Sequence, residues 1–166
     1  MGHAVLARAD ASRSGGGRAI PRDGTAQVGR ADRPRPAGAA LDFGQYAHSN
    51  QPSHHVPFLY TWTDSPWKAD HAVRSVLEQL YDSSPSGFCG DEDNGEMSSW
   101  YVLASLGLYQ VCPARPEYRL TAPLFEEAIV DAEGGRRLRV LAPGSSTNAR
   151  YAGPIRVDGG MIRAGW

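Results

Sequence analysis

Apolar residues recur at helical spacing in the middle of the chain. Between residues 65 and 85 they return at every third or fourth position, which is typical of an amphipathic helix. The apolar positions are Ala69, Ala72, Val73, Val76, Leu77, Leu80 and Tyr81. The opposite, polar face carries Asp70, Arg74, Glu78 and Asp82. Ser65 followed by Pro66 predicts the start of this helix, with a serine N-cap and proline in the first turn.

Two further helices are predicted on either side of the first. A short apolar helix covers residues 54 to about 62, with Pro57 near its first turn, where proline is tolerated. Another runs from about residue 95 to residue 106 and stops at Gly107. This last helix is apolar nearly all round, which indicates burial among neighbouring elements.

The pattern changes after residue 113. Short strands are predicted at 117–121, 127–131, 137–141 and 153–157, and Glu133-Gly134-Gly135 has the composition of a hairpin turn. The sequence therefore predicts a mixed α and β fold, with helices at 41–114 and short antiparallel strands at 115–166. The segment 1–40 is rich in Gly, Ala, Arg and Pro and shows no helical or strand period. We expect it to be a disordered leader or an artefact of the chosen start.

Composition narrows the function classes. The net charge of −1 favours neither a nucleic acid nor an acidic membrane as partner. No apolar run reaches membrane-spanning length, and the N-terminus lacks the hydrophobic segment of a signal peptide. Cys89 and Cys112 match no zinc-binding spacing, and free cysteines are the simpler interpretation.

An acidic loop precedes the apolar helix. Asp91, Glu92 and Asp93 lie between two glycines, and such crowding of like charges is costly. One interpretation is a capping box, in which Asp93 and Glu96 satisfy the first amides of the helix. The EF-hand pattern fits only the first positions of the loop, because Val102 occupies the position at which an EF-hand needs a bidentate carboxylate. The third interpretation is a general base that activates water, since a helix N-terminus keeps a carboxylate ionised.

Four motifs decide among these interpretations. They are residues 49–60 (SNQPSHHVPFLY), 66–68 (PWK), 90–101 (GDEDNGEMSSWY) and 109–113 (YQVCP). Their order and spacing resemble the C-terminal part of glycoside hydrolase family 92, over residues 43 to 166. That family comprises calcium-dependent, inverting exo-α-mannosidases, built from an N-terminal β-sandwich and an (α/α)6 barrel. The resemblance implies that 41–114 is part of the barrel and that 115–166 is a truncated β region.

The resemblance also implies a site. The family's paired aspartates fall on Asp91 and Asp93, with Asp93 as general base and Asp91 as its helper. An inverting enzyme needs such a carboxylate on the face of the sugar opposite the leaving group, with a water between. Residues expected to bind substrate are Asn50, Gln51, His54 and His48. Asn50 and Asp93 are the candidate ligands of Ca²⁺, which prefers oxygen.

Two departures from the family shape the expected function. Members specific for α1,2 linkages carry His-Glu where this chain has Asn50-Gln51, and glutamine cannot ionise. The chain is therefore closer to members that act on other mannose linkages or on mannose phosphodiesters, as in N-glycan or mannan degradation. Second, the β-sandwich, the rest of the barrel and the stretch that supplies the general acid are not recognisable in this sequence, so we expect weak activity or none from the chain alone.

Two hypotheses remain open at this point. In the first, the chain is a piece of an α-mannosidase that hydrolyses terminal mannose with inversion. In the alternative, it is a non-catalytic module that binds calcium or carbohydrate, or an orphaned gene fragment. Enzymes of this family are usually secreted or periplasmic, but no signal peptide is recognisable in this chain. Its compartment therefore stays undetermined.

Overall fold

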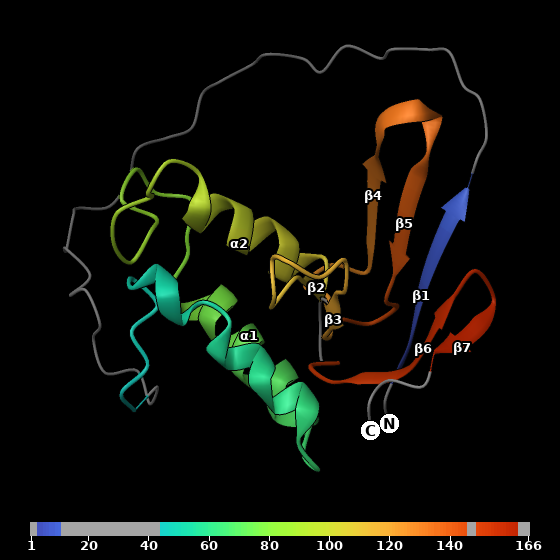
Figure 1. Ribbon diagram of the computed structural model, residues 1–166, viewed down its shortest axis with the longest axis horizontal. Coiled ribbons are helices and arrows are strands. Elements are labelled where there is room, and N and C mark those ends of the chain that lie inside the picture. Colours follow the sequence, from blue (N-terminus) through green and yellow to red (C-terminus); the bar gives the residue numbers. More distant parts are fainter. Residues whose placement is uncertain (1–2, 11–43, 146–148, 163–166) are drawn as a thin grey trace.

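The computed structural model describes residues 3–10, 44–145 and 149–162, and places helices on one side and a β-sheet on the other (Figure 1). The helices are η1 (Gln51–Ser53), η2 (Val56–Trp62), α1 (Trp67–Gln79), α2 (Glu96–Ser105) and η3 (Glu133–Gly135). The strands are β1 (His3–Asp10), β2 (Leu108–Tyr109), β3 (Arg119–Leu120), β4 (Glu127–Asp131), β5 (Arg137–Leu141), β6 (Ala152–Val157) and β7 (Gly160–Ile162). The mixed α and β fold class is confirmed.

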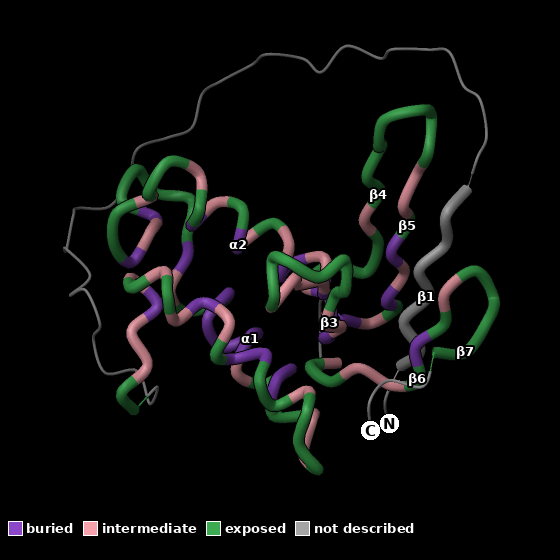
Figure 2. The backbone as a smooth tube through the Cα atoms, viewed as in Figure 1, coloured by how far each residue is buried: buried purple, intermediate pink, exposed green. Residues whose placement is uncertain are grey.

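The helical core forms where the predicted apolar stripe of α1 meets α2. Val73 and Val76 of α1 are buried in one cluster with Met97 and Trp100 of α2 and with Phe58 of η2. Figure 2 shows buried residues along both helices. The predicted short helix at 54–62 is present, but as the tighter 3₁₀ type.

The polar face predicted for α1 is not a solvent face at its first two positions. Asp70 and Arg74 are 4% and 5% exposed, because the chain after β3 packs against this side of the helix. The predicted serine cap is also wrong. Pro66 occupies the N-cap position, and no side chain caps the helix. Ser65 contributes to the helix start only through its backbone carbonyl, which accepts the Lys68 amide at 3.0 Å.

The main sheet has the strand order β4-β5-β1-β6-β7. β1 runs antiparallel to β5, with Leu6 opposite Leu141, and parallel to β6, with Leu6 opposite Arg156. The expectation of no regular structure in 1–40 is therefore wrong for His3–Asp10. The physical reason is pairing: β5 and β6 each present an unpaired edge, and a strand between them satisfies both rows of backbone groups. The rest of that predicted leader, apart from these eight residues, lies outside the described residues.

The other strands follow the sequence closely. β4, β5 and the turn at Glu133–Gly135 have the predicted bounds. The strand expected at 117–121 is shortened to β3, and the strand expected at 153–157 begins one residue earlier as β6. Among the described helices, none is both long and apolar enough to cross a membrane.

Candidate functional site

The two polar loops that carry the predicted site lie against each other. The side-chain amide of Gln51 donates to the backbone carbonyl of Asp91 at 3.4 Å. At Gly90, an added Cβ would lie 2.6 Å from the Cβ of Ser49. Only glycine permits so close an approach. The structure therefore brings the segment around Asn50 next to the acidic loop, although 40 positions separate Gln51 from Asp91.

The acidic loop reverses direction through three consecutive left-handed residues. Asp93 and Asn94 both have φ of 58°, and Gly95 has φ of 101°. Aspartate and asparagine adopt this region at lower cost than most residues, because their short polar side chains form local hydrogen bonds. The turn places the residue before it, Glu92, beside the N-terminus of α2.

Glu92 caps α2, so the predicted capping box of Asp93 and Glu96 is wrong. One carboxylate oxygen of Glu92 accepts the Gly95 amide at 2.5 Å. The other accepts the Ser98 hydroxyl at 2.6 Å and the Ser98 amide at 3.3 Å. The hydrogen bonds from Ser98 and Gly95 hold the pKa of Glu92 below its usual value. The capping-box pattern did not predict that Glu92 caps the helix, because this role of Glu92 depends on the left-handed turn.

With Glu92 acting as the cap, its two neighbours remain available. Asp91 and Asp93 are both exposed, and Asn50 is exposed on the facing loop. Neither aspartate lines the hollow between α1 and η2 or the apolar hollow under α2. The sharing of one water by Asp91 and Asp93 stays a prediction.

His48 lies in the core instead of at the surface of the loop. It is 2% exposed, its Nδ1 is 2.7 Å from the Tyr46 hydroxyl, and its Nε2 is 2.6 Å from the Tyr81 hydroxyl. Burial and the neighbouring His54 lower the pKa of His48 to about 3, so the ring is neutral. Both nitrogens are engaged, which leaves His48 no polar atom for a ligand in this arrangement. Its contribution to the site is to position His54.

His54 lies under the contact between the two loops. Its ring stacks on His48 with centroids 4.5 Å apart, and its Nε2 donates to the carbonyl of His48 at 2.9 Å. The carbonyl of His54 accepts the indole N–H of Trp100 at 3.0 Å. Its Nδ1 lies 3.7 Å from a carboxylate oxygen of Glu96 and has no hydrogen-bond partner among the described residues. Burial lowers the pKa of His54, although the His48 carbonyl and Glu96 oppose this.

A complete calcium site is not formed by these loops alone. The described part of the chain contains no group of three or more His, Cys, Asp or Glu side chains able to hold a metal ion. Asn50 and Asp93 together offer side-chain oxygens to only part of a shell, whereas calcium takes roughly six to eight oxygen ligands. The donor set of the described residues therefore does not fit the ion by itself.

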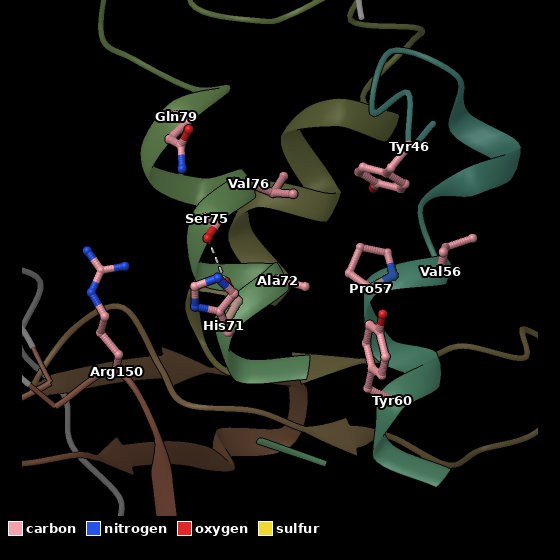
Figure 3. A pocket seen from close by; sticks show the side chains of 10 residues that line it. All are labelled: Tyr46, Val56, Pro57, Tyr60, His71, Ala72, Ser75, Val76, Gln79 and Arg150. Atoms are coloured by element: carbon pink, nitrogen blue, oxygen red, sulfur yellow. Dashed lines mark hydrogen bonds between the residues drawn. The ribbon is translucent and has the colours of Figure 1, made fainter. Parts of the chain in front are cut away.

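A hollow of about 540 Å³ lies on the other side of the helical core, between α1 and η2 (Figure 3). Its lining residues are Tyr46, Val56, Pro57, Tyr60, His71, Ala72, Ser75, Val76, Gln79 and Arg150. The hydroxyl of Ser75 is already used, because it donates to the backbone carbonyl of His71 at 2.8 Å. None of the predicted site residues lines this hollow, although Val56, Pro57 and Tyr60 belong to the motif at 49–60.

Comparison with known proteins identifies the family. Residues 23–166 match the model of the glycosyl hydrolase family 92 catalytic domain. The chain belongs to this family. The match begins at residue 23, whereas the family motifs recognised in the sequence begin near residue 43.

Two solved structures that the chain resembles are mannosidases of this family. Over 57% of the chain, it is 34% identical to the family GH92 alpha-mannosidase BT3965 from Bacteroides thetaiotaomicron, with a TM-score of 0.55. Over 66% of the chain, it is 42% identical to the family GH92 inverting mannosidase BT2199 from the same species, also with a TM-score of 0.55. A curated relative, an uncharacterized secreted glycosidase from Arthroderma benhamiae, is 29% identical over 77 residues, or 46% of the chain. The family 92 chain spans only 13% and 14% of the two solved structures and 10% of the curated relative.

Proposed function

We propose that this chain forms the water-activating part of an α-mannosidase site, in which Asp93 is the general base and Asp91 its helper. Hydrolysis would proceed with inversion. Membership of family 92 and the likeness to two mannosidases support this proposal over a non-catalytic binding module. The helices would belong to the (α/α)6 barrel of the complete enzyme.

The observation that carries the proposal is the contact between the two polar loops. Gln51 reaches the backbone of Asp91, and Ser49 lies against Gly90. A base and its substrate contacts must be held in fixed relative positions, since small displacements lose much of the rate. The two loops come from distant parts of the sequence and pack closely at a glycine. Such a contact would hold the base and the substrate contacts in fixed positions.

The division of labour within the acidic loop supports the same proposal. A carboxylate that caps a helix is fixed by its hydrogen bonds and is a poor proton acceptor. Glu92 fills that role, and the exposed Asp91 and Asp93 on either side remain free to accept a proton from water. A positioned general base contributes roughly 10²–10⁴-fold to a rate.

The substrate class follows from the facing loop. Asn50 and Gln51 are uncharged hydrogen-bonding groups, which suit sugar hydroxyls and add no negative charge beside the acidic loop. We propose mannosides of linkages other than α1,2, or mannose phosphodiesters, as substrates. We propose that Asn50 and Asp93 bind calcium together with oxygen ligands from outside the described residues. Calcium takes no part in the proton transfer proposed here.

The test compares three versions of the 166-residue chain: wild type, Asp93→Asn and the matched control Asp64→Asn, an exposed aspartate outside both loops. Each is assayed on a panel of α-mannosides and mannose phosphodiesters, with calcium and with chelator. We expect Asp93→Asn to lower hydrolysis by roughly 10²-fold or more and Asp64→Asn to leave it unchanged. NMR of the first product is expected to show the inverted anomer.

Two results would contradict the proposal. Equal hydrolysis by wild type and Asp93→Asn would remove Asp93 from the role of base. Absence of both hydrolysis and calorimetric binding of methyl α-mannoside, in a chain shown to be folded, would remove the site from this chain.

A further inference from the structure

The contact between His54 and Glu96 contains an unmatched pair of acceptors. The Nε2 of His54 faces the carbonyl oxygen of His48, which can only accept, so Nε2 carries the proton. In the neutral ring the other nitrogen, Nδ1, then presents a lone pair. It is buried in a residue that is 2% exposed, and none of the described residues donates to it.

A carboxylate oxygen of Glu96, itself an acceptor, lies near this nitrogen. The Glu96 carboxylate oxygen lies 3.7 Å from Nδ1, too far for a hydrogen bond and without a proton of its own to give. A buried acceptor without a donor is unfavourable, so the arrangement calls for donors from outside. The Glu96 side chain is 52% exposed, so the carboxylate of the pair meets solvent, whereas Nδ1 beside it is covered.

We propose that His54 Nδ1 and the Glu96 carboxylate form a hydroxyl-binding pair that takes two neighbouring hydroxyl groups of the substrate sugar. This inference rests on the proposed function and extends it, because it adds Glu96 to the site and gives His54 a defined atom and role. Two adjacent sugar hydroxyls supply the two donors that the two acceptors lack.

The pair is placed at the proposed site by both loops. His54 follows η1, which begins at Gln51 in the loop facing the acidic turn. Glu96 opens α2 directly after that turn, and its amide bonds to the carbonyl of Asp93 at 3.3 Å. A sugar held by this pair would therefore lie beside the proposed base.

The two acceptors differ in rigidity. His54 is fixed by its stack on His48, by its Nε2 hydrogen bond and by the indole of Trp100. The Glu96 carboxylate forms no hydrogen bond among the described residues, and its approach to His54 is longer than a hydrogen bond. A fixed acceptor beside an adjustable one suits recognition of one ring orientation with little reorganisation.

The test follows the ring nitrogens of ¹⁵N-histidine-labelled chain by NMR while methyl α-mannoside is added. We expect the unprotonated Nδ1 resonance of His54 to move toward the value of a hydrogen-bonded acceptor, and the His48 resonances to stay. Glu96→Ala is expected to weaken binding roughly 10-fold, the usual effect of losing one hydrogen bond to a charged group. The control Glu117→Ala, at an exposed glutamate away from both loops, is expected to bind as wild type does.

Monodeoxy mannosides separate a direct contact from a structural effect. If Glu96 binds a hydroxyl, one deoxy analogue loses affinity for wild type but loses none further in Glu96→Ala. Glu96→Gln gives a second readout: its amide donates to Nδ1 and shifts that resonance without any sugar.

The outcomes distinguish this inference from the proposed function. Binding of the mannoside with an unmoved Nδ1 resonance, or with equal affinity in Glu96→Ala and Glu117→Ala, overturns the hydroxyl-binding pair and leaves the base assignment intact. A folded chain that binds no mannoside overturns both.

Discussion

The buried carboxylate of Asp70 in α1 accepts the backbone amide of Ala152 at 2.9 Å, across 82 positions of sequence. Its other oxygen accepts the amide of Ala122 at 2.8 Å. One turn further along the helix, Arg74 donates to the carbonyls of Pro123 and Ser145 at 3.2 and 2.9 Å. These two side chains join the helical core, and with it the acidic loop, to the β region.

Asp70 gives the stability of the chain a distinctive pH dependence. Burial raises the pKa of this carboxyl to about 6, against the opposing hydrogen bonds from Ala152 and Ala122. Because the folded pKa lies above the unfolded one, the contribution of Asp70 is fully present below about pH 4 and is lost as pH rises through about 6. The change is on the order of 3 kcal/mol, from roughly two pKa units.

The measurement is urea unfolding of wild type and Asp70→Ala between pH 4 and pH 7. The other titrating groups are common to both chains and cancel in the difference. We expect the stability advantage of wild type over Asp70→Ala to shrink as pH rises across this window. An advantage that grows with pH would mean that the ionised carboxylate is the favoured form.

A second prediction concerns the cap of α2. Glu92→Ala removes the acceptor of the Gly95 amide and of the Ser98 amide and hydroxyl. We expect thermal unfolding a few degrees lower and faster hydrogen exchange of these two amides, because helix N-termini depend on such partners. The matched control is Asp93→Asn, since asparagine also tolerates the left-handed conformation. An equal loss in both variants would place the cap on Asp93 after all.

A third prediction concerns the close approach of the two loops. Gly90→Ala forces a methyl group against Ser49, and the loops must separate. We expect a loss of about 1–3 kcal/mol in the free energy of unfolding, the usual cost of overpacking, together with weaker mannoside binding. The control is Gly160→Ala, where the added Cβ meets the Val157 carbonyl oxygen at an ordinary 3.4 Å. Unchanged stability and binding in Gly90→Ala would show that the contact between the loops is dispensable.

Spacing and turn composition predicted the elements that have a regular residue pattern. The stripe of α1, the apolar α2 and the hairpin of β4 and β5 all follow from spacing and turn composition. The spacing of residues did not predict burial by segments that are distant in the sequence. Asp70 and Arg74 lie on the predicted polar face, and their burial does not follow from spacing because the segments that bury them lie some 50 to 80 positions later.

The candidate site was predictable from its motifs but not in its details. The motifs identified both loops, and the structure brings them together. They did not reveal that Glu92 caps the helix or that His48 is buried with both nitrogens engaged. Each of these depends on backbone conformation and on neighbours from other elements, which a residue pattern does not specify.

The buried ring of Trp100 lies in one aromatic cluster with the stacked rings of His48 and His54. The Trp100 ring lies 4.3 Å from His48 and 5.9 Å from His54, measured between centroids, and is 1% exposed, whereas Trp62 and Trp67 are about half exposed. We expect its fluorescence to be blue-shifted from theirs and sensitive to the charge of either imidazole. An intrinsic emission signal would then report on the buried side chains beside the two polar loops without any added dye.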